Sequence, residues 1–120
     1  MKNCTKRAIA YIVGSVRLKN QSNSIYDFSA SKHYAFSGQI SDEQVSIYDF
    51  DEKCHLSGGG GRGNYALYHF GNGKHISLEI AGDNFNGYDY DTGAHFSGCI
   101  NSNTISLYDY QDSKYYNYTT

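Results

Sequence analysis

The chain has 120 residues and a formal net charge of −2 at pH 7, from 12 acidic and 10 basic side chains. A charge this close to neutral gives no electrostatic attraction to nucleic acid or to an anionic membrane, so neither is an expected partner. The length limits the chain to a single domain with one modest core. Thirteen tyrosines, 13 glycines and no proline or tryptophan favour β-strands over helices.

The N-terminal stretch places basic side chains before an apolar run at residues 8–13. This order resembles a signal peptide, but the run is short and no small-x-small cleavage site follows it. We therefore expect a cytoplasmic protein, and we predict a degenerate hairpin over residues 1–14 whose second strand ends at Gly14. The three cysteines are an odd number without metal-like spacing, which indicates reduced thiols.

A short signature of tyrosine, an aspartate or histidine, and a second aromatic residue recurs along the chain. Its copies begin at Tyr26, Tyr48, Tyr68, Tyr88 and Tyr108, in steps of 22 and then 20, 20 and 20 residues. A fixed period of this size indicates a repeat architecture. Because turn residues interrupt the chain about every ten residues, each repeat is predicted as an antiparallel hairpin. We predict an all-β fold of about six tandem hairpins, the first degenerate, closed in a pseudo-symmetric ring or barrel. An open single-layer sheet and a β-solenoid are the alternatives.

The segment from Phe70 to His75 shows how one hairpin is expected to turn. Asn-Gly between alternating segments is a strong signal for a two-residue type I′ turn. With Asn72-Gly73 at the tip, Phe70 pairs with His75 across the hairpin. The equivalent tips are Glu52-Lys53, Thr92-Gly93 and Asp112-Ser113.

Three stretches depart from the regular repeat. Residues 17–23 form a longer connector. The repeat that begins at Ile25 carries two extra residues, which leaves open whether His33 or Ala35 takes the slot of the later histidines. The run from Gly58 to Gly63 leads into a strand and lacks the Lys-Ser/Thr of a phosphate-binding loop, so we expect a flexible loop between hairpins.

Ile47-Tyr48-Asp49-Phe50, a tip, and His55-Leu56-Ser57-Gly58 together resemble a group of small bacterial proteins, the 4-fold beta flower family. The resemblance covers residues 8–118. It implies hairpins arranged like petals around a pseudo-symmetry axis, although this chain has more than four of them. It implies no activity and no catalytic residues.

The hairpin pairing separates two faces, because cross-strand partners share a face. One face carries aliphatic side chains and aspartates, and we expect it to form the core because the aliphatic groups lack polar atoms. The other carries tyrosine, histidine and serine, which combine packing surface with hydrogen-bonding groups and suit recognition. Burial of both faces in a two-layer packing is the alternative. The candidate binding residues are Tyr48, Tyr68, Tyr88, Tyr108, His55, His75 and His95.

The repeated histidines and aspartates are weighed as metal ligands. Imidazoles brought together around an axis bind transition metals, and clustered carboxylates hold cations. No second ligand set stands at metal spacing, so we expect each histidine to stack beside its aromatic partner. We expect each aspartate to accept hydrogen bonds from a neighbouring hairpin backbone or a tyrosine hydroxyl, and no metal or other cofactor. The aspartates are Asp27, Asp49, Asp89 and Asp109.

No arrangement of nucleophile, base and orienting group is visible in the sequence. We therefore expect a non-catalytic binding or protein-interaction module that takes a small ligand, a glycan or a peptide. A purely structural oligomerisation unit and a small metal-dependent hydrolase are the alternatives. Two partly apolar faces on so short a chain also lead us to expect a homo-oligomer, a dimer.

Overall fold

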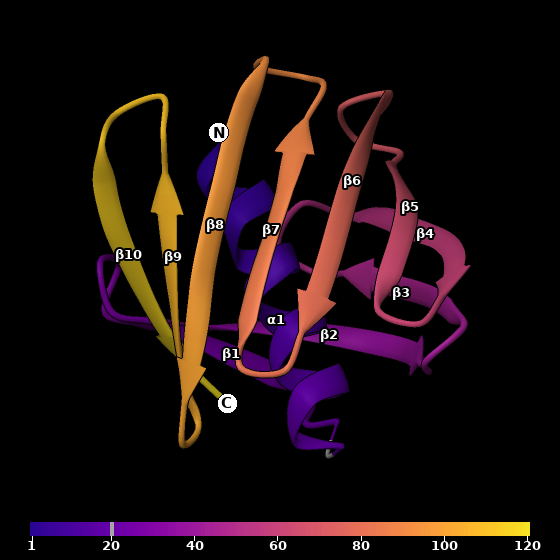
Figure 1. Ribbon diagram of the computed structural model, residues 1–120, viewed down its shortest axis with the longest axis horizontal. Helices are drawn as coiled ribbons and strands as arrows, with labels where there is room; N and C mark the ends of the chain where they lie inside the picture. Colours follow the sequence, from indigo (N-terminus) through magenta and orange to yellow (C-terminus); the bar gives the residue numbers. More distant parts are fainter. Residues whose placement is uncertain (20) are drawn as a thin grey trace.

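The computed structural model describes residues 1–19 and 21–120. Within them, one helix, α1 (Asn3–Leu18), is followed by ten strands that close into an antiparallel barrel (Figure 1). The closed all-β arrangement is therefore confirmed, and the open sheet and the solenoid are excluded. The strands are β1 (Ser24–Asp27), β2 (Lys32–Ile40), β3 (Gln44–Asp49), β4 (Cys54–Gly61), β5 (Asn64–His69), β6 (Lys74–Ala81), β7 (Asn84–Asp89), β8 (Ala94–Asn101), β9 (Thr104–Asp109) and β10 (Lys114–Thr119).

Helix α1 fills the interior of the barrel. Figure 1 shows it behind β7 and β8, and every residue from Cys4 to Ser15 is buried. Side chains alone fill a barrel of about eight strands. Ten strands leave a wider space, which a helix roughly 10 Å across can occupy. No helix in the described part of the chain has the length and apolar character needed to cross a bilayer.

The hairpin predicted over residues 1–14 is wrong, and the described residues form five hairpins rather than six. The apolar side chains of Ile9, Ile12, Val13 and Val16 recur with helical spacing, and a helix enclosed on all sides is apolar around most of its circumference. The connector predicted over residues 17–23 begins inside α1, and Asn20 within it lies outside the described residues.

The hairpin loops contain four residues rather than the predicted two. Tyr68 pairs with His75 and His69 with Lys74, so the true register is displaced by two residues from the predicted one. The displacement keeps every side chain on its predicted face, because the side chains of a strand alternate with a period of two. The fourth loop residue has a left-handed backbone in all five hairpins, with φ between 52° and 67°. These residues are Ser31, Lys53, Gly73, Gly93 and Ser113.

The inward face is the core, as predicted. Ile47 and Leu67 are 1% and 0% exposed, and the inward side chains pack against α1. The other predicted core residues are equally buried: Leu56, Ile76, Phe96, Ile105 and Leu107. The two-layer alternative, which would bury both faces, is not what the barrel does, because its outer face is open to solvent.

The barrel closes at a short seam between β1 and β10. Two residue pairs define its register, Tyr26 with Thr119 and Asp27 with Tyr118, whereas β9 and β10 share six. Helix α1 contacts strands on both sides of this seam, namely β1 and β2 on one side and β9 and β10 on the other. The helix therefore fills the barrel and also bridges the place where the sheet is paired least.

Charged and aromatic side chains of α1 make this bridge. Lys6 lies over the ring of Tyr116 in β10, with Nζ 3.4 Å from the ring centroid. Arg7 lies over Tyr34 in β2 at 3.7 Å, and Tyr11 stacks on Phe36 in the same strand at 4.6 Å. Cation–π and stacking contacts of this kind contribute roughly 0.5–2 kcal/mol each.

Two further expectations need correction or completion. Gly58–Gly61 belong to β4 and are not a flexible loop, and the turn itself is Arg62-Gly63.

The two extra residues of the first hairpin lie in β2, not at its tip. His33 pairs with Tyr26 in its own hairpin, while the Ala35 carbonyl accepts the Phe50 amide of the next hairpin, as the His55 carbonyl accepts that of Phe70. His33 therefore takes the histidine position within the first hairpin, and Ala35 takes it at the junction with the second hairpin.

Candidate functional site

The inward aspartates form the loop end of the barrel interior. Each accepts hydrogen bonds through Oδ1 from backbone amides of the loop that follows it, as Asp49 does from Asp51 and Glu52 at 3.0 and 3.1 Å. Backbone amides are therefore the donors, but they belong to the same hairpin, so the predicted partners, a neighbouring hairpin or a tyrosine hydroxyl, are wrong. The other three make the same contact: Asp27 with Ser29, Asp89 with Asp91, and Asp109 with Gln111.

One of these aspartates, Asp109, contacts the N-terminal end of α1. Asp109 lies 3.5 Å from the Lys6 ammonium group and 3.0 Å from the Met1 amino group, and it is 1% exposed. The first turn of α1 has no acidic residue and no side-chain cap. Carboxylates of the barrel therefore supply the negative charge that favours a helix N-terminus.

His69 replaces aspartate in the third hairpin and performs the same local task. Its Nδ1 accepts the Asn72 amide at 3.1 Å, and the ring is 2% exposed. Burial lowers the pKa of His69, while the carboxylates of Asp49 and Asp89 act in the opposite direction. The neutral imidazole is thus the form that fits this position. Burial also raises the pKa of Asp49, whose Oδ2 has no hydrogen-bond partner.

The outer face carries five aromatic clusters, one beside each hairpin loop. In each hairpin a half-buried tyrosine contacts the first loop residue and the cross-strand histidine or tyrosine, with centroids 4.7 to 5.1 Å apart. We call these five sets the aromatic belt: Tyr26, Phe28 and His33; Tyr48, Phe50 and His55; Tyr68, Phe70 and His75; Tyr88, Tyr90 and His95; Tyr108, Tyr110 and Tyr115.

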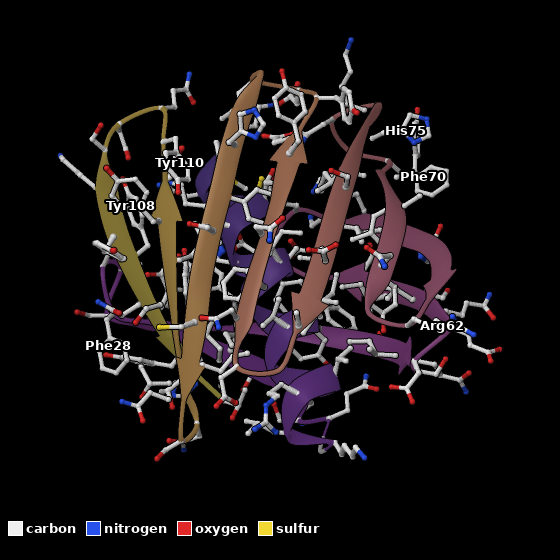
Figure 2. All side chains as sticks on the ribbon, viewed as in Figure 1. Phe28, Arg62, Phe70, His75, Tyr108 and Tyr110 are labelled. Carbon is white, nitrogen blue, oxygen red and sulfur yellow. The ribbon has the colours of Figure 1, made fainter. Side chains whose placement is uncertain are left out.

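The belt points away from the barrel. Figure 2 shows Phe70 and His75 beside each other at the right-hand edge, and Tyr108 and Tyr110 on the opposite side. The rings of Phe70 and Tyr90 are 56% and 57% exposed. Edge-to-face contacts of about 0.5–1.5 kcal/mol each help to fix the orientation of these exposed rings.

Three grooves lie at the junctions where one hairpin pairs with the next. We call them the junction grooves, and each is lined by a histidine and a serine of one hairpin and by the loop aromatic residue of the next. Their volumes are about 610, 590 and 320 Å³, in the size range of small-ligand sites. The sets are His55, Ser57 and Phe70; His75, Ser77 and Tyr90; and His95, Ser97 and Tyr110.

The other two junctions lack the complete set. Ala35 stands where a histidine would line the junction between the first and second hairpins. At the closing seam, Asn117 and Thr119 take the places of histidine and serine. The complete combination of histidine, serine and aromatic residue therefore occurs on one side of the barrel, from β4 to β9.

The residues predicted from the sequence divide into two groups. His55, His75 and His95 line the grooves, on the outside of the barrel and on different hairpins. The predicted tyrosines Tyr48, Tyr68, Tyr88 and Tyr108 stand behind, as supports for the rings that line the grooves. The loop aromatic residues and the serines were missed as site residues, although the repeat itself places them on the predicted recognition face.

The histidines do not meet around an axis. Each lies edge-to-face against the tyrosine of its own hairpin, as at 4.8 Å between His55 and Tyr48, and not stacked on Phe50, the partner that the predicted pairing gave it. Among the described residues no three histidine, cysteine, aspartate or glutamate side chains form a group suited to a metal ion.

Comparisons with protein-family models, with curated protein sequences and with solved structures find no match to this chain. What is established is the class of fold, a compact antiparallel β-barrel closed around a central helix. Function has to be inferred from the geometry of the belt and the grooves.

Proposed function

We propose that the protein is a non-catalytic binding module whose outer aromatic belt holds ligands in the junction grooves. The observation that carries the proposal is the threefold occurrence of one histidine–serine–aromatic set around exposed rings. Folding does not account for these rings, because Phe70, Tyr90 and Tyr110 remain 55% to 57% exposed and lie outside the core. Exposed aromatic residues with polar neighbours are typical of recognition surfaces.

The grooves favour binding over catalysis. Each combines a flat apolar ring with neutral hydrogen-bonding groups, an imidazole and a hydroxyl. In the part of the chain that the structure describes, no hydrogen bond joins a groove histidine to a groove serine. The Ser97 hydroxyl instead lies 3.1 Å from the Tyr110 hydroxyl. Without a base on the hydroxyl, the serine is not activated as a nucleophile.

A ligand screen tests this function. We would measure the melting temperature of the protein against a panel of mono- and oligosaccharides, short peptides and aromatic metabolites. The variant with Phe70→Ala, Tyr90→Ala and Tyr110→Ala should lose the stabilisation that a ligand gives the wild type, because all three grooves lose their ring.

The matched control is the variant with Phe28→Ala and Phe50→Ala. These rings occupy the same loop position and are 51% and 52% exposed, but they line none of the three grooves. The control variant should keep the ligand response. A response that survives the triple substitution, or a panel without any response in the wild type, would contradict the proposal.

We also propose that the protein forms a homodimer through the belt residues that the grooves leave uncovered. Phe28, Phe50 and Tyr115 are 51% to 68% exposed, and such apolar side chains are commonly covered at an interface. Light scattering should give twice the chain mass of 13.4 kDa, and Phe28→Ala with Tyr115→Ala should return it to one chain mass. A wild-type protein that stays at 13.4 kDa at high concentration would rule the dimer out.

Two expectations from the sequence are kept as proposals. The free thiols of Cys4, Cys54 and Cys99 support a reducing, cytoplasmic location. The resemblance to the 4-fold beta flower family is supported by hairpins that close around an axis, although here there are five of them.

A further inference from the structure

A further hollow, distinct from the three junction grooves, lies on the outer face of β4–β7, next to the junction groove of His75 and Tyr90. It has a volume of about 460 Å³ and shares Ala66 and Ser77 with that groove, so the two hollows are continuous. Gly59 pairs with Ala66, and Ala66 pairs with Ser77, which puts these three residues in one row across the strands. We call this row, with the hollow above it, the glycine track.

The track is where the outer face departs from its own repeat. At the equivalent junctions the outward pair is Gln39 with Ser46, Glu79 with Asn86, or Cys99 with Ser106. Here it is Gly59 with Ala66, the one pair of the four without a polar side-chain atom. Because Gly59 and Ala66 lack larger side chains, the sheet backbone is uncovered here and forms a bare floor, whereas the equivalent pairs are covered by their side chains.

Packing of the barrel does not require this bare floor. A Cβ atom on Gly59 would lie 3.4 Å from the Glu43 carbonyl oxygen, an ordinary contact, and one on Gly61 would meet nothing within 4 Å. By contrast, a Cβ atom on Gly58 or Gly60 would collide with the backbone of β5. The fold thus accounts for Gly58 and Gly60 but not for the outward-facing Gly59.

The track has two unlike borders. His75 and Tyr90 stand at the border toward the hairpin loops, and Asn64, Glu79 and Asn86 line the other. Glu79 pairs with both asparagines across the sheet, and Asn86 Nδ2 lies 3.5 Å from Glu79 Oε1. One border therefore offers flat rings and the other offers amide donors and carboxylate acceptors. The row of three residues crosses two strand spacings of about 4.8 Å and is roughly 10 Å long, enough for about two sugar rings.

We infer that the glycine track and the adjoining junction groove bind a linear, uncharged oligosaccharide of pyranose units. The inference rests on the proposed binding function and names its ligand class. A pyranose presents C–H faces that pack on tyrosine and histidine rings, and its hydroxyls both donate and accept hydrogen bonds. The bare floor lets successive rings lie against the sheet.

The same features disfavour the other extended ligands. A peptide that adds a strand needs a free sheet edge, and a closed barrel has none. A nucleic acid needs clustered cations, whereas among the described residues that line the two hollows Lys74 is the one lysine or arginine, and Glu79 offsets its charge.

Calorimetric titration with unbranched 1,4-linked gluco-, xylo- and chito-oligosaccharides of one to six units tests the inference. In at least one series the affinity should rise at least about tenfold between one and four units, because longer chains reach the track. Gly59→Leu should remove that rise by filling the floor, and Ala66→Leu should do the same from the neighbouring strand. Gly61→Leu is the matched control, and it should keep the rise because its side chain projects into open space.

The outcomes separate this inference from the proposed function. If monosaccharides bind through the junction grooves and affinity does not rise with chain length, the grooves stand and the track is refuted. If peptides or other ligands bind through Tyr90 and no saccharide does, the ligand class is refuted and the binding module stands. A length dependence that Gly59→Leu and Ala66→Leu leave unchanged, in proteins with wild-type circular dichroism, also refutes the track.

Discussion

His69 stands in place of an aspartate among the inward carboxylates at the loop end of the barrel, and it makes the stability of the whole fold depend on pH. Its buried ring accepts a loop amide through Nδ1, and a proton on that nitrogen would remove the acceptor. Burial lowers its pKa below the ordinary 6.5. The unfolded chain therefore binds a proton at higher pH than the folded chain, so the stability contributed by neutral His69 is present above pH 6.5 and is lost as the pH falls below it.

The expected result is a fall in unfolding free energy of up to about 1.4 kcal/mol per pH unit as the pH falls below 6.5. His69→Asp should flatten this slope, because a carboxylate can accept the same amide without titrating as an imidazole does. Asp49 acts in the opposite sense, since burial raises its pKa, and its contribution opposes the slope that His69 gives. Urea denaturation at several pH values measures the difference. Equal slopes in the two proteins would show that His69 is not the titrating group.

At the scale of elements, the strands were predictable and the helix was not. The signature beginning at each tyrosine, followed by turn residues, locates all five hairpins and both faces. The prediction of which side chains share a face is correct although the predicted turn is wrong, because a register shift of two residues leaves every side chain on the same face. The tip was misjudged because Asn72-Gly73 suggests a type I′ turn. The inward Asp or His instead binds the loop amides and stabilises a four-residue loop.

The N-terminal segment was misjudged for a different reason. Ile9, Ile12 and Val13 are β-branched and have strand-like propensity, and the repeat pattern around them is entirely β. Their helical spacing is the contrary signal, but only closure of ten strands creates the interior that makes a helix the better filler. Tertiary structure decides here against local preference.

The candidate site was half visible in the sequence. The repeat placed His55, His75 and His95 on the recognition face, but the ring beside each one comes from the next hairpin, and only the sheet pairing reveals that neighbour. The glycine track was hidden because a run of four glycines suggests a loop. The constant 20-residue period was the available correction, since β4 needs Gly58–Gly61 to match the length of β6 and β8.

At the scale of the whole molecule, one face holds the barrel together and the other is free for recognition. The core is continuous from α1 to the inward side chains of every strand, and each aspartate at its loop end accepts a backbone amide of its own loop. The outer belt adds edge-to-face contacts but contributes no residue to that core. Substitutions on the two faces should therefore have separable effects on stability and on binding.

Paired substitutions test this separation. Ile47→Ala with Leu67→Ala should unfold the protein, because each truncation of a fully buried side chain costs about 2–5 kcal/mol against a total stability of about 5–15 kcal/mol. Tyr68→Ala with Tyr88→Ala should leave a cooperative thermal transition and a wild-type circular dichroism spectrum, because both rings are half-buried on the outside.

The tyrosine pair should nevertheless weaken ligand binding. Tyr68 supports Phe70 and His75, and Tyr88 supports Tyr90 and His95, at centroid distances of 4.7 to 4.9 Å. Without these supports the groove rings gain rotational freedom that a ligand has to remove, at a cost of about 0.5–1.5 kcal/mol for each side chain. Thermal melts and titration of both variants decide the matter. A tyrosine pair essential for folding, with a dispensable Ile47 and Leu67, would invert the roles of the two faces and make the aspartate-lined end the place to look for a site.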